Sequence, residues 1–144
     1  MWRFLNLLSL FFVILLHGTA GPAMGGNLEG PPEAKNAAQA WLGLLDKDEF
    51  ATAWKKTAPH FQEKMKEKDF VGDLKRARAD LGAFRSRQLV DVQALVDPPK
   101  SPPGRYVVLL YKTTFAKHLP VDERVSMVAT DKGDWSVAGY HFVR

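Results

Sequence analysis

The stretch FRSRQLVDVQALVD, residues 84–97, decides the fold class, because the spacing of its apolar residues changes there from about 3.6 to two. Apolar and polar residues alternate from Val90 to Val96, with Asp91 and Gln93 on the opposite side, as expected for a half-buried strand. The chain before this stretch has helical periodicity, and the chain after it has the pattern of strands and turns. The sequence therefore predicts an α+β protein with an N-terminal helical part and a C-terminal sheet.

Three further strands are predicted downstream of this first one. Residues 98–104, PPKSPPG, are predicted to form a loop, because proline has no N–H to donate to a strand ladder. The run RYVVLLYKTTF, residues 105–115, is apolar on both faces, which is typical of a central strand covered on two sides or by a partner. Residues 123–130 alternate again, and residues 135–143 return after a turn at Gly133. The four strands predict an antiparallel meander.

Three helical segments are predicted upstream, each with an apolar stripe that repeats every three or four residues. The first begins at Glu33, and the second covers residues 49–65, where Pro59 permits only a kink or a fresh start. The third begins with Asp69 as its N-cap and ends at Gly82. The side chains expected on the solvent sides of the third helix are Lys75, Arg76, Arg78 and Asp80. We expect the three helices to pack on one face of a curved four-stranded antiparallel sheet, giving a cone-like shape.

The N-terminus has the pattern of a secretory signal peptide. Arg3 precedes an apolar run over residues 4–16, which is shorter than the roughly 20 residues that cross a bilayer as a helix. Small residues follow, so cleavage is predicted after Ala23 or Ala20, with Ala23 preferred because Pro22 disfavours the earlier site. An uncleaved membrane anchor is the alternative interpretation.

This pattern divides the chain into three parts. Residues 1–23 are the predicted signal peptide, and residues 24–32, rich in glycine and proline, are a predicted flexible lead. Residues 33–144 are predicted to form a single α+β domain.

Composition and charge exclude several classes of site. The 144 residues include no cysteine, so disulfides, thiolate catalysis and cysteine zinc sites are excluded. The four histidines have no metal-ligand spacing, and we expect neither a metal nor another cofactor. A net charge of +4, spread over the chain, does not indicate nucleic-acid binding. Export without cysteine suits a bacterial periplasm or exterior.

Several strings together resemble a known family. They are FATAWKKTAPHF, LGAFRSRQL, PGRYVVLLYKTTF, a lone Glu123 in the following strand, and WSVAGYHFVR. From about Ala37 to Arg144 the chain resembles the bacterial exported family of domain of unknown function 4019. The resemblance implies a nuclear transport factor 2-like or cystatin-like fold and homodimerisation through the sheet, but the family has no established activity to transfer.

The residue with the most chemical interest is Glu123. Glu123, Val125 and Met127 are alternate residues of one predicted strand and therefore lie on the same face. The carboxylate is thus expected to face inward, where it needs a cation or strong hydrogen-bond donors. The partners considered for it are Arg85, Arg87, Lys112 and the hydroxyls of Tyr111 and Thr113. Glu123 then either orients a polar ligand on a pocket floor or forms a structural ion pair at the open end of the cone, which is the favoured interpretation because such pairs are commoner.

Aromatic residues from the strands complete the candidate site. Core packing accounts for most of these aromatic residues. A concave sheet lined by tyrosine and tryptophan would also suit a small apolar or aromatic ligand. The candidate ligand-binding residues are Arg85, Arg87, Tyr111, Thr113, Phe115, Glu123, Trp135 and Tyr140.

Three functions are compatible with these patterns. The first is a secreted or periplasmic noncatalytic module that binds an unknown small molecule or protein. The second is a small cone-fold enzyme that uses Glu123, His60 or His118 as an acid-base catalyst, an interpretation that depends on fold analogy. The third is an accessory protein of the cell envelope, held weakly by an uncleaved N-terminus or by the basic stretch over residues 75–87.

Overall fold

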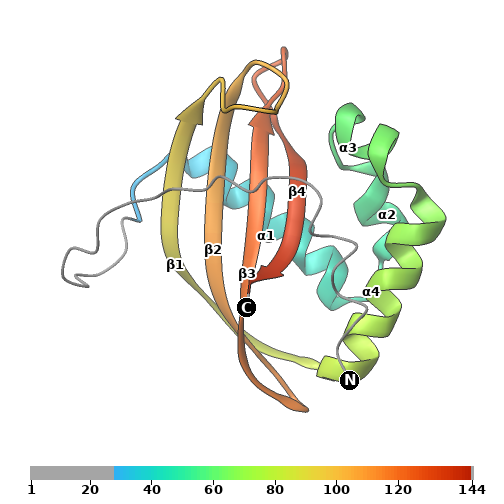
Figure 1. The fold of residues 1–144 in the computed structure, drawn as a ribbon. Coiled ribbons are helices and arrows are strands. Elements are labelled where there is room, and N and C mark those ends of the chain that lie inside the picture. The colour runs from blue at the N-terminus through green and yellow to red at the C-terminus, as the bar shows by residue number, and fades with distance from the viewer. Residues whose placement is uncertain (1–27, 144) are drawn as a thin grey trace.

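The computed structural model describes residues 28–143, and these residues form four helices and one four-stranded sheet (Figure 1). The predicted signal peptide and residues 24–27 of the predicted lead lie outside the described residues. The elements in chain order are α1 (Pro32–Asp46), α2 (Phe50–Lys55), α3 (Pro59–Lys64), α4 (Glu67–Leu81), β1 (Phe84–Val96), β2 (Arg105–Phe115), β3 (His118–Ala129) and β4 (Trp135–Val143). The α+β class is as predicted.

The prediction of three helices is wrong, because the expected second helix is two short ones. α2 ends at Lys55, and α3 starts afresh with Pro59 in its first turn. Between them Ala58 is extended, and its N–H donates to the carbonyl of Val137 at 2.7 Å. Proline lacks the N–H that would continue a helix, so the break is a local property of the sequence that the β4 contact stabilises.

The last helix differs from expectation at one end. α4 begins at Glu67, so Asp69 lies inside its first turn and does not cap it. The helix ends at Gly82 as predicted, where a φ of 82° favours glycine. A Cβ at this position would also lie 2.8 Å from the Lys117 side chain.

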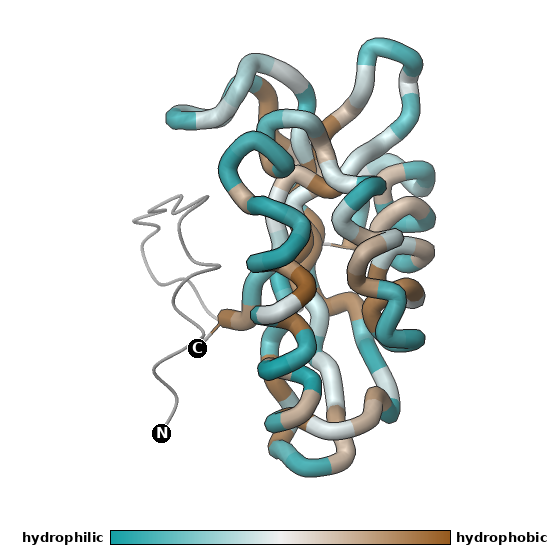
Figure 2. The backbone as a smooth tube through the Cα atoms, turned by 90° about the vertical axis from the view of Figure 1, so that its right-hand side faces the viewer, coloured by the Kyte–Doolittle hydropathy of each residue, from teal (hydrophilic) through white to brown (hydrophobic). Residues whose placement is uncertain are grey.

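The sheet is the predicted antiparallel meander in the order β1-β2-β3-β4. β2 and β4 have the predicted bounds, whereas β3 begins earlier than expected, at His118. Helix α1 packs against β3 and β4, α3 packs against β4, and α4 packs on α2 (Figure 1). Figure 2 shows hydrophilic residues along most turns, with hydrophobic residues recurring along the helices and strands.

Two irregularities in β1 change which of its side chains face the core. The pairing with β2 shifts between Phe84 and Ser86 and again between Leu89 and Asp91. Leu89 therefore lies opposite Tyr111, and Arg87 lies opposite Thr113, on the same face as the buried Val92. Strict alternation had predicted Ala94 and Val96 as buried, but both are exposed, Val96 by 72%.

Trp41 on α1 joins the layers of the core. Its ring packs edge-on against Tyr140 of β4, at 5.3 Å between centroids, and lies 6.3 Å from Phe70 of α4. Its indole N–H donates to the carbonyl of Ala53 on α2 at 2.9 Å. The side chain is thus both a large apolar contact and a satisfied buried donor. Within residues 28–143, no helix has the length and apolar character needed to span a membrane.

Candidate functional site

Glu123 lies at the centre of the site and is completely buried. Its Oε1 accepts a hydrogen bond from Nε of Arg87 at 3.0 Å and lies 2.9 Å from Nη2 of the same guanidinium. Its Oε2 accepts a hydrogen bond from the hydroxyl of Tyr140. Both carboxylate oxygens are therefore engaged, as a buried charge requires.

Arg87 bridges Glu123 to a second carboxylate. Its Nη1 donates to Oδ2 of Asp46 at 2.7 Å, and its Nη2 donates to Oδ1 at 3.0 Å. Oδ1 of Asp46 also accepts a bond from Nη2 of Arg78 at 3.2 Å. Tyr140, Glu123, Arg87, Asp46 and Arg78 form one continuous network, which we call the charge cluster.

The charge cluster connects both long helices to the sheet. Asp46 is the last residue of α1, and Arg78 lies in the last turn of α4. Arg87, Glu123 and Tyr140 come from β1, β3 and β4. Two positive and two negative groups balance, so the cluster is electrically neutral and needs no further ion for charge balance.

Aromatic rings support the two guanidinium groups. Arg78 lies over the ring of Phe115 at 4.6 Å, and Arg87 lies over the ring of Phe84 at 4.7 Å. A planar guanidinium can stack on a ring while its edges donate hydrogen bonds, which an ammonium cannot do. The rings thus hold both arginines without competing for their donors.

The electrostatic surroundings keep Arg87 charged and Tyr140 protonated. Burial alone lowers the pKa of Arg87, but the hydrogen bonds and charges of Asp46 and Glu123 outweigh it, so this pKa lies above its usual value. Burial, together with the charge of Glu123, raises the pKa of the Tyr140 hydroxyl well above its usual value. Burial also raises the pKa of Tyr111, to about 12.

Three buried polar atoms around the charge cluster have no hydrogen-bond partner within residues 28–143. They are Nε of Arg78, the hydroxyl of Tyr111 and the hydroxyl of Thr113. Tyr111 lies opposite Glu123, and Thr113 lies opposite Arg87. Unpartnered buried donors are costly, so these atoms indicate where water or a ligand would be stabilised.

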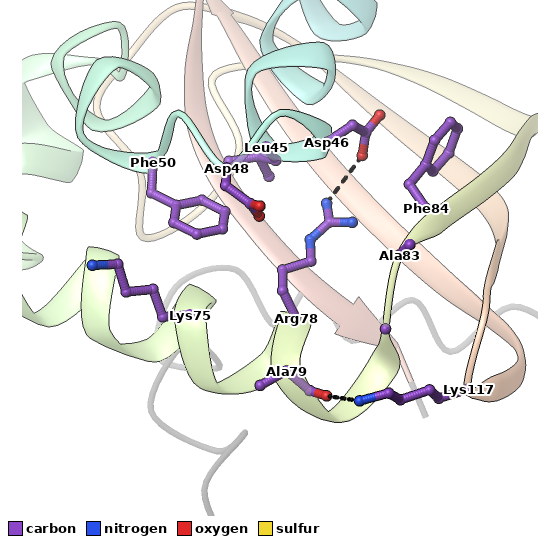
Figure 3. A pocket seen from close by; sticks show the side chains of 11 residues that line it. Leu45, Asp46, Asp48, Phe50, Lys75, Arg78, Ala79, Ala83, Phe84 and Lys117 are labelled. Atoms are coloured by element: carbon purple, nitrogen blue, oxygen red, sulfur yellow. Dashed lines mark hydrogen bonds and ion pairs between the residues drawn. The ribbon is translucent and has the colours of Figure 1, made fainter.

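A pocket of about 680 Å³ opens beside the charge cluster (Figure 3). Asp46 and Arg78 belong to both the cluster and the pocket wall, so we call it the cluster pocket. Its lining residues are Leu45, Asp46, Asp48, Phe50, Lys75, Arg78, Ala79, Gly82, Ala83, Phe84 and Lys117. A second pocket, of about 480 Å³, lies between α1 and the β3–β4 end and includes Trp41, Met127 and Trp135.

The family described as protein of unknown function (DUF4019) matches residues 37–140. The chain belongs to this family. The match spans all five residues of the charge cluster and the lining of both pockets. No curated protein matches the chain.

The DUF4019 chain brings together some of the residues expected from the sequence and separates others. Arg87, Glu123 and Tyr140 bond directly to one another. Tyr111 and Thr113 lie beside them on β2, and Phe115 joins through its contact with Arg78. Arg85 is exposed at the first irregularity of β1, and Trp135 pairs with Ala129 at the other end of β4. Lys112 pairs with Asp122 near the surface, away from Glu123.

Sequence reasoning missed two cluster residues of the DUF4019 chain, Asp46 and Arg78. Arg78 was expected on a solvent-facing side of its helix, but only 8% of it is exposed, so that expectation is wrong. Each of the two follows a buried leucine by four residues, Leu42 and Leu74, which places it at the edge of an apolar stripe. That spacing was the available signal.

The histidines within residues 28–143, His60, His118 and His141, lie outside the charge cluster. His118 is exposed, and burial, with the charge of Lys64, lowers the pKa of His60. Burial, with the charge of Arg124, lowers the pKa of His141 to about 4. Among residues 28–143, no group of three histidine, aspartate or glutamate side chains is arranged to hold a metal ion.

His141 predicts a loss of stability in acid. Its pKa is lower in the folded chain than the unfolded value of 6.5, so protons favour unfolding as the pH falls from about 6.5 towards 4. A shift of this size corresponds to at most about 3 kcal/mol, and partial exposure of the ring reduces the expected loss to roughly 1–2 kcal/mol. Denaturant unfolding at several pH values should show a shallower pH slope for His141→Gln than for wild type. The exposed control His118→Gln should keep the wild-type slope, and equal slopes in all three proteins would contradict the prediction.

Proposed function

We propose that the chain is a noncatalytic binding module that takes a small molecule in the cluster pocket. The observation that carries this proposal is that the charge cluster is electrically neutral, engages both oxygens of Glu123 and also forms a wall of the pocket. A general base must have a lone pair within reach of the substrate proton, whereas both oxygens of Glu123 already accept bonds from buried donors. This arrangement favours a role for the charge cluster in forming a binding pocket over a role in proton transfer.

The size and lining of the cluster pocket support the same proposal. A volume of about 680 Å³ is within the range of about 300–1,000 Å³ typical of small-molecule sites. Apolar side chains from α1, α2 and β1 share the lining with charged ones from α4 and the β2–β3 turn. A small molecule with both an apolar part and a charged group would fit this lining.

The pattern of the N-terminal sequence and the family resemblance support two further parts of the proposal. We propose that the module is exported from a bacterial cell, and that its sheet and helices form the cone of nuclear transport factor 2-like proteins. The intact mass of the protein purified from its cells should correspond to cleavage after Ala23 or Ala20. An uncleaved mass would instead favour a membrane anchor.

A ligand screen tests the binding function. Ligands that bind the folded state raise the melting temperature, by the equivalent of about 2.7 kcal/mol at a hundred times Kd. We expect small metabolites or cell-wall fragments to stabilise the wild type but not Ala79→Trp, because Ala79 is an exposed lining residue and an indole there would obstruct the pocket.

Ala51→Trp is the matched control, since Ala51 is an exposed helical alanine outside the lining. It should bind ligands like the wild type. Ligands that stabilise Ala79→Trp as well as they stabilise the wild type would place binding elsewhere, and a screen without any stabilising ligand would count against a binding module.

A further inference from the structure

The lining of the cluster pocket has more positive than negative side chains. Asp46 already receives three hydrogen bonds from Arg78 and Arg87, so its negative charge is compensated inside the charge cluster. The remaining charged lining residues are Lys75, Lys117 and the exposed Asp48. The pocket therefore has an excess of positive charge over what its own carboxylates neutralise.

Arg78 provides a recognition group within this lining. Its side chain is more than nine-tenths buried, it lines the pocket, and its Nε–H has no partner within residues 28–143. The neighbouring Nη2 makes only a 3.2 Å bond to Asp46 (Figure 3). Nε and Nη2 form the edge of a guanidinium that matches the two oxygens of a carboxylate, and a charged acceptor there would satisfy the unpartnered donor.

Apolar groups lie within the same pocket. The rings of Phe50 and Phe84 and the side chain of Leu45 line it together with Arg78. Leu45 and Phe50 are buried and Phe84 is half-buried, so the exposed part of the Phe84 ring is the apolar surface that a compact apolar body would cover and a purely charged ligand would leave in water. Asp48 opposes an anion, but solvent screens the charges of Asp48, Lys75 and Lys117 alike because all three are exposed, and the two ammonium groups outnumber the one carboxylate.

We propose that the cluster pocket binds a small organic carboxylate, with the carboxylate at the Nε edge of Arg78 and the apolar body against Phe84. This inference rests on the proposed function, because it names the ligand class for the same pocket. Lys75 and Lys117 add attraction from the walls without occupying the cluster.

Three probes of the same shape and different charge test the ligand class. Benzoate, benzamide and benzylamine are titrated into the purified protein while the amide signals of the pocket residues are followed by NMR. We expect benzoate to bind at least tenfold more tightly than benzamide, and benzylamine to be the weakest. Inorganic phosphate tests charge alone, and we expect it to bind at least tenfold more weakly than benzoate. Phosphate binding as tight as benzoate would overturn the role of the apolar body.

Variants of the wall separate specific recognition from general attraction. Arg78→Met should abolish benzoate binding, but it also removes a cluster partner and its fold is at risk. The double variant Lys75→Met with Lys117→Met leaves every cluster bond in place and should weaken benzoate binding five- to tenfold without changing benzamide binding. Lys132→Met, at the exposed turn between β3 and β4, is the matched control and should bind benzoate like the wild type.

The outcomes distinguish this inference from the proposed function. Benzamide that binds in the pocket as well as benzoate, or a double variant with unchanged benzoate affinity, would overturn the carboxylate assignment and leave a binding pocket. Absence of signal changes with all three aromatic probes would also overturn it, while the broader ligand screen with Ala79→Trp would still decide whether the pocket binds anything.

Discussion

Replacing Arg87 with methionine is expected to lower the free energy of unfolding by about 3–5 kcal/mol, because removal of one partner of a buried ion pair leaves an uncompensated charge. Glu123 would keep its carboxylate at a position with no solvent exposure and retain only the hydroxyl of Tyr140 as a donor. Asp46 would keep only its bond from Arg78. Methionine approximates the length and apolar stem of arginine, so lost packing contributes little.

Arg85→Met is a close control for Arg87→Met. Arg85 lies two residues earlier on the same strand, but it is exposed at an irregularity of β1. Its replacement should change stability by no more than about 0.5 kcal/mol. Equilibrium unfolding in urea measures both variants, and similar losses for the two would show that the Arg87 bonds contribute little to the folded state.

Glu123→Gln is the second substitution with a large expected effect, a loss of about 3 kcal/mol. Glutamine keeps the shape of the side chain but replaces one acceptor oxygen with an NH₂ donor and removes the charge that balances Arg87. Arg87 and Tyr140 both donate to Glu123 in the wild type, so the new NH₂ group must face one of these two donors. That contact is then lost or must be rearranged. The thermal midpoint and the urea midpoint should both fall.

Asp122→Asn tests whether any carboxylate on β3 has this effect. Asp122 is the neighbour of Glu123, but it is partly exposed and pairs with the exposed Lys112, so its loss should cost less than about 1 kcal/mol. If Glu123→Gln were as stable as the wild type or more stable, the buried carboxylate would be retained at a cost to folding, and a functional role for Glu123 would be favoured.

Local sequence patterns were sufficient to predict that the strands form, because those patterns act over a few residues. The prolines of residues 98–104 and the turn at Gly133 delimit β2 and β4, and the alternation around Glu123 placed its carboxylate inside. The same patterns were insufficient in β1, where the irregularity between Leu89 and Asp91 changed the face on which Arg87 lies. Register depends on the pairing with β2, which a single strand does not encode.

The candidate site was also only partly predictable, because some of its residues are far apart in the sequence. The inward position of Glu123 and its need for a cation could be inferred from alternation and from the cost of burying a charge. The choice of Arg87 over Arg85 and Lys112 could not, because it depends on strand register. Asp46 and Arg78 are separated by 32 residues, and only the packing of α1 and α4 brings their side chains together.

The sequence by itself determined the α+β class, the meander and the burial of a carboxylate on β3, since periodicity and turn residues act locally along the chain. The tertiary structure decided how that charge is neutralised and where a pocket opens. Both depend on groups from α1, α4 and β1 meeting at one end of the sheet, and such meetings follow from packing geometry over distances that local patterns do not reach.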